Sequence, residues 1–306
     1  FKIVTLSCFH EGLLNMQISN QALAALKNFK APETLGFGTV MSPIMVESDY
    51  RDGQWSEPKV VTYGPLYLDP TTKVLHYGQE IFEGMKAYRV NGFGPYLFRP
   101  DKNFKRFNHS ARRMAMPEVP EELFMESVKC ITKLSAHLIP NKTGESLYIR
   151  PFMIGTQVHL GIKASTHLKF LVVASPSSSY FSADSLELLI EREAARACPG
   201  GTGTAKTGGN YAASLKSMID AQNLGYHQVL WLDSVHKKYV EELSGMNIFF
   251  LYGQELHTPA LTDTILEGVT RDSILQIASQ LNYKGVERKI DINEVISDLR
   301  TGKCHG

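Results

Sequence analysis

The sequence predicts a two-domain protein of the α+β (mixed α/β) class. The chain has 306 residues, of which 43% are hydrophobic and 21% charged, as is typical of globular protein with roughly two domains. Short apolar or alternating runs broken by Gly and Pro fill residues 36–90 and predict strands and hairpins. After residue 210, helical and extended patterns alternate. The Ser/Pro cluster at 175–179 lies between these regions and is the expected linker.

In the region before the linker, strands are expected on both sides of two helices. Apolar residues at steps of three and four predict one helix that begins at Pro100 and another over 121–138. The expected strands are 39–46, 59–62, 74–77, 85–90, 146–154 and 168–174.

In the region after the linker, the first helix follows Asn210 and ends at Gly225, a residue type favoured just beyond a helix. A second helix is expected over 270–281 and a third from residue 291. The expected strands are 228–232, 238–242, 246–252 and 286–290.

The composition excludes several classes of partner. A formal net charge of +1 gives no reason to expect nucleic acid or an anionic membrane surface. The longest apolar runs, such as 170–174 and 248–252, are far too short to span a bilayer. Four scattered cysteines without paired spacing indicate free thiols in a reducing compartment, so we expect a cytoplasmic protein without a metal site.

A glycine-rich stretch from Gly200 to Tyr211 holds a single charge, Lys206. A Walker loop needs Gly before the lysine, where Ala205 stands, and the dinucleotide pattern fails because Lys206 occupies its last Gly position. A lysine in an uncharged, Gly-lined site suits imine chemistry, because desolvation favours the neutral amine. Glycine and threonine are also common in surface turns, so both interpretations stay open from these residues alone.

Several stretches taken together resemble one family, the branched-chain aminotransferases within the class IV (fold type IV) pyridoxal-phosphate enzymes. The stretches are 37–39 (FGT), 75–88 (LHYGQEIFEGMKAY), 99–106 (RPDKNFKR), 146–151 (SLYIRP), 206–211 (KTGGNY), 242–249 (ELSGMNIF), Thr258 and 266–271 (LEGVTR). The resemblance runs from about residue 33 to residue 300 in consistent order. It implies a fold like that of D-amino-acid aminotransferase, with an extension (1–32), a small α/β domain (33–175), a linker (176–186) and a larger cofactor-binding domain (187–306).

The resemblance assigns the cofactor, pyridoxal 5'-phosphate, to a set of residues. Lys206 corresponds to the lysine that bonds covalently to the cofactor and moves the substrate proton, since a neutral amine is both nucleophile and base. Glu242 corresponds to the carboxylate that keeps the pyridine nitrogen protonated, and Tyr211 to the partner of the cofactor's O3'. The implied phosphate ligands are Arg106 and the backbone amides of Val269 and Thr270.

The resemblance also assigns the substrate site. The apolar side-chain pocket corresponds to Phe37, Phe82, Tyr148 and Tyr180. Positions that reach into a neighbouring subunit's site correspond to Tyr77, Leu160 and Ile162, which implies a homodimer. Arg150 corresponds to the arginine for the side-chain carboxylate of glutamate or 2-oxoglutarate. Such an arginine, engaged or bypassed, would let one pocket accept both an aliphatic chain and a carboxylate.

The chain departs from the family at its ends. It leaves the family pattern after Lys303 and ends at Gly306. We therefore expect a truncated second domain that lacks the last strands and the loop for the substrate α-carboxylate, with lowered stability and activity. Met16 is the expected start, which makes residues 1–15 an upstream read-through or a fragment edge.

The implied reaction moves the amino group of L-leucine, L-isoleucine or L-valine to 2-oxoglutarate in a ping-pong cycle. Alternatives in the same class are a D-amino-acid aminotransferase and aminodeoxychorismate lyase, and the stretches 37–39 and 148–151 favour the branched-chain enzymes. The alternative from a different class is a non-catalytic remnant that at most binds the cofactor.

Overall fold

The computed structural model describes residues 3–5, 16–179 and 185–305. The chain divides into two compact units, residues 1–182 and 183–306. Both units combine helices with sheets, which confirms the mixed α/β class. The division falls inside the segment 176–186, while the functional domain boundaries given above remain a prediction.

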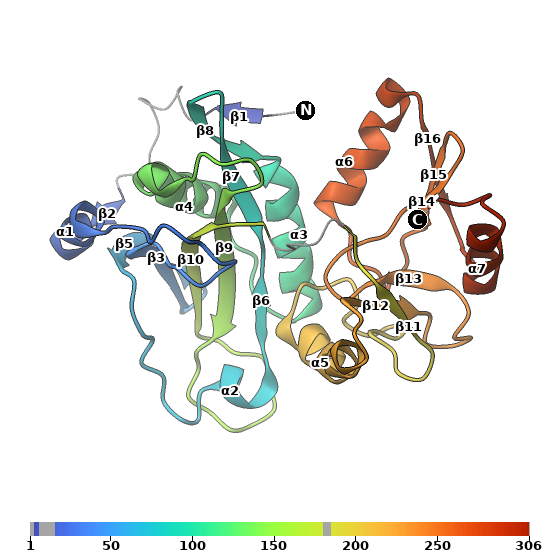
Figure 1. Ribbon diagram of the computed structural model, residues 1–306. Helices are drawn as coiled ribbons and strands as arrows, with labels where there is room; N and C mark the ends of the chain where they lie inside the picture. The colour runs from blue at the N-terminus through green and yellow to red at the C-terminus, as the bar shows by residue number, and fades with distance from the viewer. Residues whose placement is uncertain (1–2, 6–15, 180–184, 306) are drawn as a thin grey trace. The chain divides into compact units, whose positions relative to one another are not determined.

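The first unit is built on a ten-stranded sheet (Figure 1). The strand order is β1-β8-β7-β9-β10-β3-β5-β2, with β4 beside β3 and β6 beside β9, and every pair is antiparallel except β2 with β5. The strands are β1 (Ile3–Thr5), β2 (Gln17–Ile18), β3 (Ile44–Arg51), β4 (Gln54–Trp55), β5 (Lys59–Thr62), β6 (Glu80–Phe82), β7 (Met85–Val90), β8 (Phe93–Phe98), β9 (Ser146–Gly155) and β10 (Leu168–Ser177).

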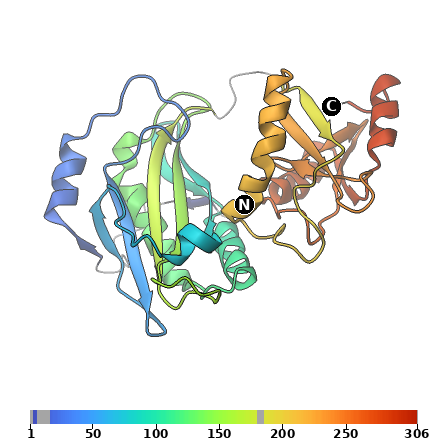
Figure 2. The ribbon, with the colours of Figure 1, turned by 90° about the horizontal axis from the view of Figure 1, so that it is seen from below.

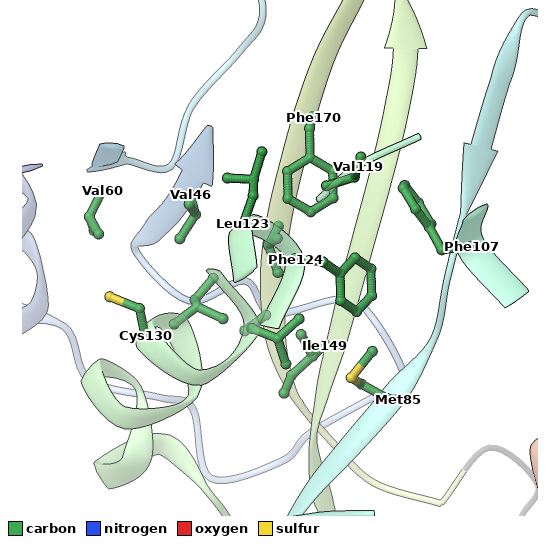
Figure 3. Packing of buried hydrophobic residues seen from close by; sticks show 14 of the residues in the cluster. Val46, Val60, Met85, Phe107, Val119, Leu123, Phe124, Cys130, Ile149 and Phe170 are labelled. Carbon is green, nitrogen blue, oxygen red and sulfur yellow. The ribbon is translucent and has the colours of Figure 1, made fainter. Parts of the chain in front are cut away.

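Two amphipathic helices, α3 (Pro100–Arg113) and α4 (Glu121–Leu134), supply the core of this unit. Phe107 of α3 lies 5.3 Å from Phe124 of α4 and 5.7 Å from Phe170 of β10, measured between ring centroids. Figure 3 shows these three rings within the buried cluster that joins the helices to the sheet. The other helical segments of the unit are α1 (Asn20–Asn28), α2 (Lys73–Tyr77) and a 3₁₀ turn (Ala136–Leu138).

The second unit has two three-stranded sheets, β11-β12-β13 and β14-β15-β16. Every residue of β12 is buried, because its alternate faces pack on different helices. Trp231 packs with Ala221 of α5, which lies along β12 (Figure 2), while Leu230 packs in the cluster that holds Val295 of α7. The elements are β11 (Leu188–Glu191), α5 (Gly208–Asn223), β12 (Gln228–Leu232), β13 (Val240–Leu243), β14 (Phe250–Tyr252), β15 (Glu255–Pro259), α6 (Val269–Ala278), a 3₁₀ turn (Ser279–Leu281), β16 (Lys284–Arg288) and α7 (Ile292–Arg300).

Three expectations about local structure were wrong. Residues 74–77, expected as a strand, belong to helix α2, which ends at Gly78 in the left-handed conformation with φ 56°. The strand expected at 39–46 is β3 at 44–51, because it begins only after Pro43. The expected linker at 175–179 is still strand up to Ser177, which pairs with Ser146.

Candidate active site

Lys206 is positioned by a loop that Asn210 closes. The loop joins β11 to α5, and Asn210 lies in the first turn of α5. The Nδ2 atom of Asn210 donates to the carbonyl oxygens of Thr202 and Ala205 at 2.8 Å each, and its Oδ1 accepts from the Thr202 hydroxyl at 2.6 Å. These bonds fix the backbone immediately before Lys206 against the start of the helix.

The amine of Lys206 contacts the phenol of Tyr211. Lys206 Nζ donates to Tyr211 Oη at 2.8 Å and lies 5.2 Å from the centroid of its ring. The spacing of five residues places the phenol in the first turn of α5, beside the loop that carries the lysine. An amine and a phenol at this distance form a pair that can hold or pass a proton.

Glu242 lies in β13 and is only 4% exposed. Its Oε1 forms an ion pair with Arg196 Nη2 at 2.7 Å, and its Oε2 accepts from Asn247 Nδ2 at 3.0 Å. Burial raises the pKa of Glu242 to about 7, although Arg196, the amide of Leu266 and the charge of Lys206 oppose the rise. Lys206 is thus one of the charges that favour the ionised form of Glu242.

Asn247 connects Glu242 to the start of α6. Its Nδ2 also donates to the carbonyl oxygen of Leu266 at 3.0 Å. A Cβ atom at position 268 would lie 1.9 Å from Asn247 Oδ1, so the place of Asn247 requires glycine at Gly268. Gly268 is the N-cap of α6, so the first helical residues, Val269 and Thr270, follow directly. The amides at this end carry the positive end of the helix dipole, which favours an anion.

Arg106, in α3 of the first unit, is bound to a buried carboxylate. Its Nε lies 2.6 Å from Glu83 Oε1 and its Nη2 lies 2.9 Å from Glu83 Oε2. Glu83 is fully buried and also accepts from Asn103 Nδ2 at 2.7 Å. The guanidinium is therefore held in a fixed orientation on α3, and its role toward a phosphate stays a prediction.

The first unit also contains a pocket of about 300 Å³ that brings together Phe37, Tyr148 and Arg150. The rings of Phe37 and Tyr148 lie 4.9 Å apart between centroids. The Arg150 guanidinium lies 4.6 Å from the centroid of the Phe82 ring and donates to the Tyr148 hydroxyl. The rings of Phe82 and Tyr148 thus both lie against one cation.

Tyr77 and Leu160 are joined directly, since the Tyr77 hydroxyl donates to the carbonyl oxygen of Leu160. Tyr77 is 41% exposed and Leu160 56%, and Ile162 in the same loop as Leu160 is 90% exposed. Tyr180 lies outside the described residues, so its predicted place in the pocket is not tested.

Sequence reasoning missed five residues that hold the predicted ones, or their partners, in place: Arg196, Asn210, Asn247, Glu83 and Asn103. Arg196 follows three charged residues, 191–193 (ERE), so the sequence gives no signal that sets it apart. Glu83, Asn103, Asn210 and Asn247 lie within the quoted family stretches but were not given roles.

Among residues 3–5, 16–179 and 185–305, His, Cys, Asp and Glu side chains form no group of three or more that could bind a metal ion. No helix in this described part of the chain is long and apolar enough to cross a membrane.

Comparison with known proteins gives a consistent result. The family model for amino-transferase class IV matches residues 80–298. The chain is 45% identical to branched-chain-amino-acid transaminase 1 of Bacillus subtilis (strain 168) over 294 residues, which covers 95% of this chain and 83% of that protein. The branched-chain aminotransferase of the archaeon Thermoproteus uzoniensis, solved with norvaline, is similar with a TM-score of 0.67 and 26% identity, covering 82% and 80% of the two chains. The branched-chain amino acid aminotransferase of Escherichia coli has a TM-score of 0.64 and 27% identity, covering 81% and 79%.

Proposed function

Since this chain belongs to the class IV aminotransferases and, within them, to the branched-chain-amino-acid aminotransferases, we propose that it transfers the amino group of L-leucine, L-isoleucine or L-valine to 2-oxoglutarate. The products are glutamate and a branched 2-oxo acid, formed in two half-reactions that share one site. The observation that carries the proposal is the arrangement of Lys206, Tyr211 and Glu242 in the second unit.

The side chains present fit pyridoxal 5'-phosphate by their chemistry. They supply an amine next to a phenol at Lys206 and Tyr211, a buried carboxylate at Glu242, and a helix start at Val269. The amine suits the cofactor's aldehyde and the phenol suits its hydroxyl. The carboxylate suits the ring nitrogen, and the helix start suits the phosphate. When bound, pyridoxal phosphate withdraws electrons from the substrate α-carbon and carries the amino group between the half-reactions.

Lys206 would carry the proton chemistry. Its neutral amine would serve as the nucleophile toward the cofactor's aldehyde and as the base toward the proton on the substrate α-carbon. Tyr211 accepts a hydrogen bond from this amine at 2.8 Å, which limits where Nζ lies. The ionised form of Glu242 would hold a proton on the ring nitrogen, and the α6 amides and Arg106 would bind the phosphate.

The pocket of the first unit supports the choice of substrates. Phe37 and Tyr148 offer apolar surface for a branched aliphatic chain, while Arg150 offers a cation for the distal carboxylate of glutamate or 2-oxoglutarate. Because Arg150 is bound to the neutral Tyr148 hydroxyl, its charge is satisfied in part when an aliphatic chain is bound. Arg150 would bind the distal carboxylate in one half-reaction and the Tyr148 hydroxyl in the other, so that one pocket serves both.

We also propose that the enzyme acts as a homodimer in the cytoplasm. Leu160 and Ile162 are exposed apolar residues at 56% and 90%, on the loop that the family places at the neighbouring subunit's site. Cys130, Cys198 and Cys304 are free thiols in the described part of the chain, which suits a reducing compartment.

The experiment that tests this function is an absorption titration of the purified full chain. Addition of pyridoxal 5'-phosphate should produce a protein-bound visible band that L-leucine removes and 2-oxoglutarate restores. The Lys206→Ala variant is the control and should not give the covalent band. If wild-type protein gives no band, or if the band does not respond to leucine while responding to a D-amino acid, the proposed function is wrong.

A further inference from the structure

Two adjacent glutamates in β13, Glu241 and Glu242, are both buried, with exposed fractions of 6% and 4%. Successive side chains of a strand point to opposite faces, so the two carboxyl groups have different neighbours. A buried carboxylate remains ionised only where donors or cations compensate its lost hydration. The neighbours of each group therefore decide how readily each of the two carboxyls ionises.

The donors are divided unequally between them. Glu242 has the guanidinium of Arg196 at 2.7 Å, the Asn247 amide at 3.0 Å and the backbone amide of Leu266 at 3.3 Å. Glu241 accepts one hydrogen bond, from the hydroxyl of Thr264. The other oxygen of Glu241, Oε2, has no hydrogen-bond partner among the described residues.

Arg196 is itself held in place by the backbone. Its Nη2 donates to the carbonyl oxygen of Gly203, at 3.2 Å, and to that of Thr264. The Arg196 side chain is 7% exposed, and Gly203 belongs to the loop that carries Lys206. A Cβ at Gly203 would lie 2.6 Å from Thr264 Cα, so the close approach of these two segments requires glycine. These contacts place Nη2 of Arg196 beside Glu242, while the buried Nε has no hydrogen-bond partner among the described residues.

We propose that Arg196 is a positioning residue that favours the ionised form of the buried Glu242 carboxyl, so that Glu242 and not its neighbour Glu241 can partner a protonated ring nitrogen. The part that concerns the ring nitrogen rests on the proposed function. The part that concerns the charge of Glu242 rests only on contacts within the second unit. No contact with a substrate is assigned to Arg196.

The charged groups around the two carboxyls predict opposite changes in the pKa of Glu242 when Arg196 or Glu241 is replaced. Arg196 and Lys206 favour the ionised form of Glu242, while Glu241 opposes it. Around Glu241, Arg196 favours the charge while Asp233 and Asp263 oppose it, and burial raises its pKa. Removal of the Arg196 charge should therefore raise the pKa of Glu242, whereas removal of the Glu241 carboxyl should lower it.

The test is a titration of Glu242 in the full chain without cofactor, by NMR of protein labelled with ¹³C at the glutamate carboxyl carbon. The Glu242→Gln variant identifies the signal. In Arg196→Met we expect the Glu242 titration to move upward by about 1 to 3 pH units, the size of a close ion pair's effect. In Arg196→Lys, which keeps the cation, it should stay within about one unit of wild type, and in Glu241→Gln it should move downward.

General damage to the fold would not move one signal in opposite directions in two variants. An unchanged Glu242 titration in Arg196→Met overturns the proposal. If that variant does not fold, Arg196→Gln takes its place, because it also removes the charge: an upward shift of the Glu242 titration supports the proposal, and an unchanged titration overturns it.

A second measurement separates this proposal from the proposed function. Wild type and Arg196→Lys are titrated with pyridoxal 5'-phosphate at pH 6 and pH 8. If the Glu242 titration shifts as predicted but pyridoxal 5'-phosphate gives no absorbance band, the role of Arg196 stands and the cofactor role of the site is refuted. A normal leucine-responsive band with an unshifted Glu242 titration in both Arg196→Met and Glu241→Gln would refute only the role of Arg196.

Discussion

Arg150 donates two hydrogen bonds to one atom, the hydroxyl oxygen of Tyr148, from Nη2 at 2.8 Å and from Nε at 3.2 Å. The two residues are two apart in β9, so both side chains lie on the same face of the strand. The partner of this guanidinium is a neutral oxygen, which is a weaker acceptor than a carboxylate. A carboxylate entering the pocket can therefore replace the hydroxyl, while an aliphatic chain leaves the pair intact.

The first prediction concerns Arg150→Ala. The half-reaction with glutamate should lose about tenfold to a hundredfold in kcat/KM, the equivalent of one hydrogen bond to a charged group. The half-reaction with leucine should change far less, because an aliphatic chain makes no use of the cation. Single-turnover absorbance changes with each amino acid measure the two rates separately, and equal losses in both would reject the role.

Tyr148→Phe is the matched variant for the same pair. It removes the acceptor of Arg150 and keeps the ring that packs against Phe37 at 4.9 Å. The guanidinium then has no hydroxyl to bind while leucine occupies the pocket, so the leucine half-reaction should weaken more than the glutamate half-reaction. The reverse order would mean that the hydroxyl serves glutamate directly.

The second prediction concerns the buried pair of Glu83 and Arg106. Glu83→Ala should lower the free energy of unfolding by roughly 3–5 kcal/mol, because it leaves a guanidinium with 12% exposed surface without its carboxylate. Denaturant unfolding followed by circular dichroism measures the loss. The control is Lys216→Ala in the exposed pair with Asp220, which should have a small effect. A small loss at Glu83 as well would show that Arg106 finds another partner.

The elements were predictable from the sequence wherever buried apolar residues repeat at a regular spacing. Phe107 and Phe124 repeat at helical steps with their neighbours, and both helices α3 and α4 lie where they were expected. Gly225 follows α5 with φ 90°, as a residue just beyond a helix should. Short elements were less predictable: α2 has only five residues, and the β-branched and aromatic residues in it are also typical of strands.

The site was predictable only in part, because the strongest signals came from family stretches. Lys206 is conspicuous as the single charge in a glycine-rich run, but Glu242 is one of two adjacent acids and looks like a solvated surface residue from composition alone. Arg196 reaches Glu242 from 46 positions away in the chain, through a loop with no periodic pattern. Only the folded second unit brings that cation to that carboxylate.

The third prediction concerns the core of the first unit. Phe124 is fully buried and its ring lies within 5.3 to 6.0 Å of the rings of Phe104, Phe107 and Phe170. Phe124→Ala should cost about 3–5 kcal/mol of unfolding free energy, through lost burial and the cavity left behind. Phe93→Ala removes a ring that is 70% exposed and should cost much less. Equal costs in chemical denaturation would contradict this packing.

The fourth prediction is a pH dependence of stability caused by Glu242. Burial raises the pKa of Glu242 in the folded protein to about 7, from an ordinary value of 4.5. The folded state therefore holds this proton more tightly than the unfolded state. Its contribution to stability is fully present below pH 4.5 and is lost as the pH rises through 7.

Wild type should accordingly lose stability relative to Glu242→Gln as the pH rises from 5 to 7. The loss approaches about 1.4 kcal/mol per pH unit inside this window and levels off above it. Urea unfolding of both proteins at several pH values gives the difference, in which groups common to both cancel. The slopes are compared rather than the absolute values, because the variant also leaves Arg196 without its carboxylate. Parallel curves from pH 5 to 7 would show that the Glu242 carboxyl is already ionised at the acid end, and that Arg196 and Asn247 outweigh its burial.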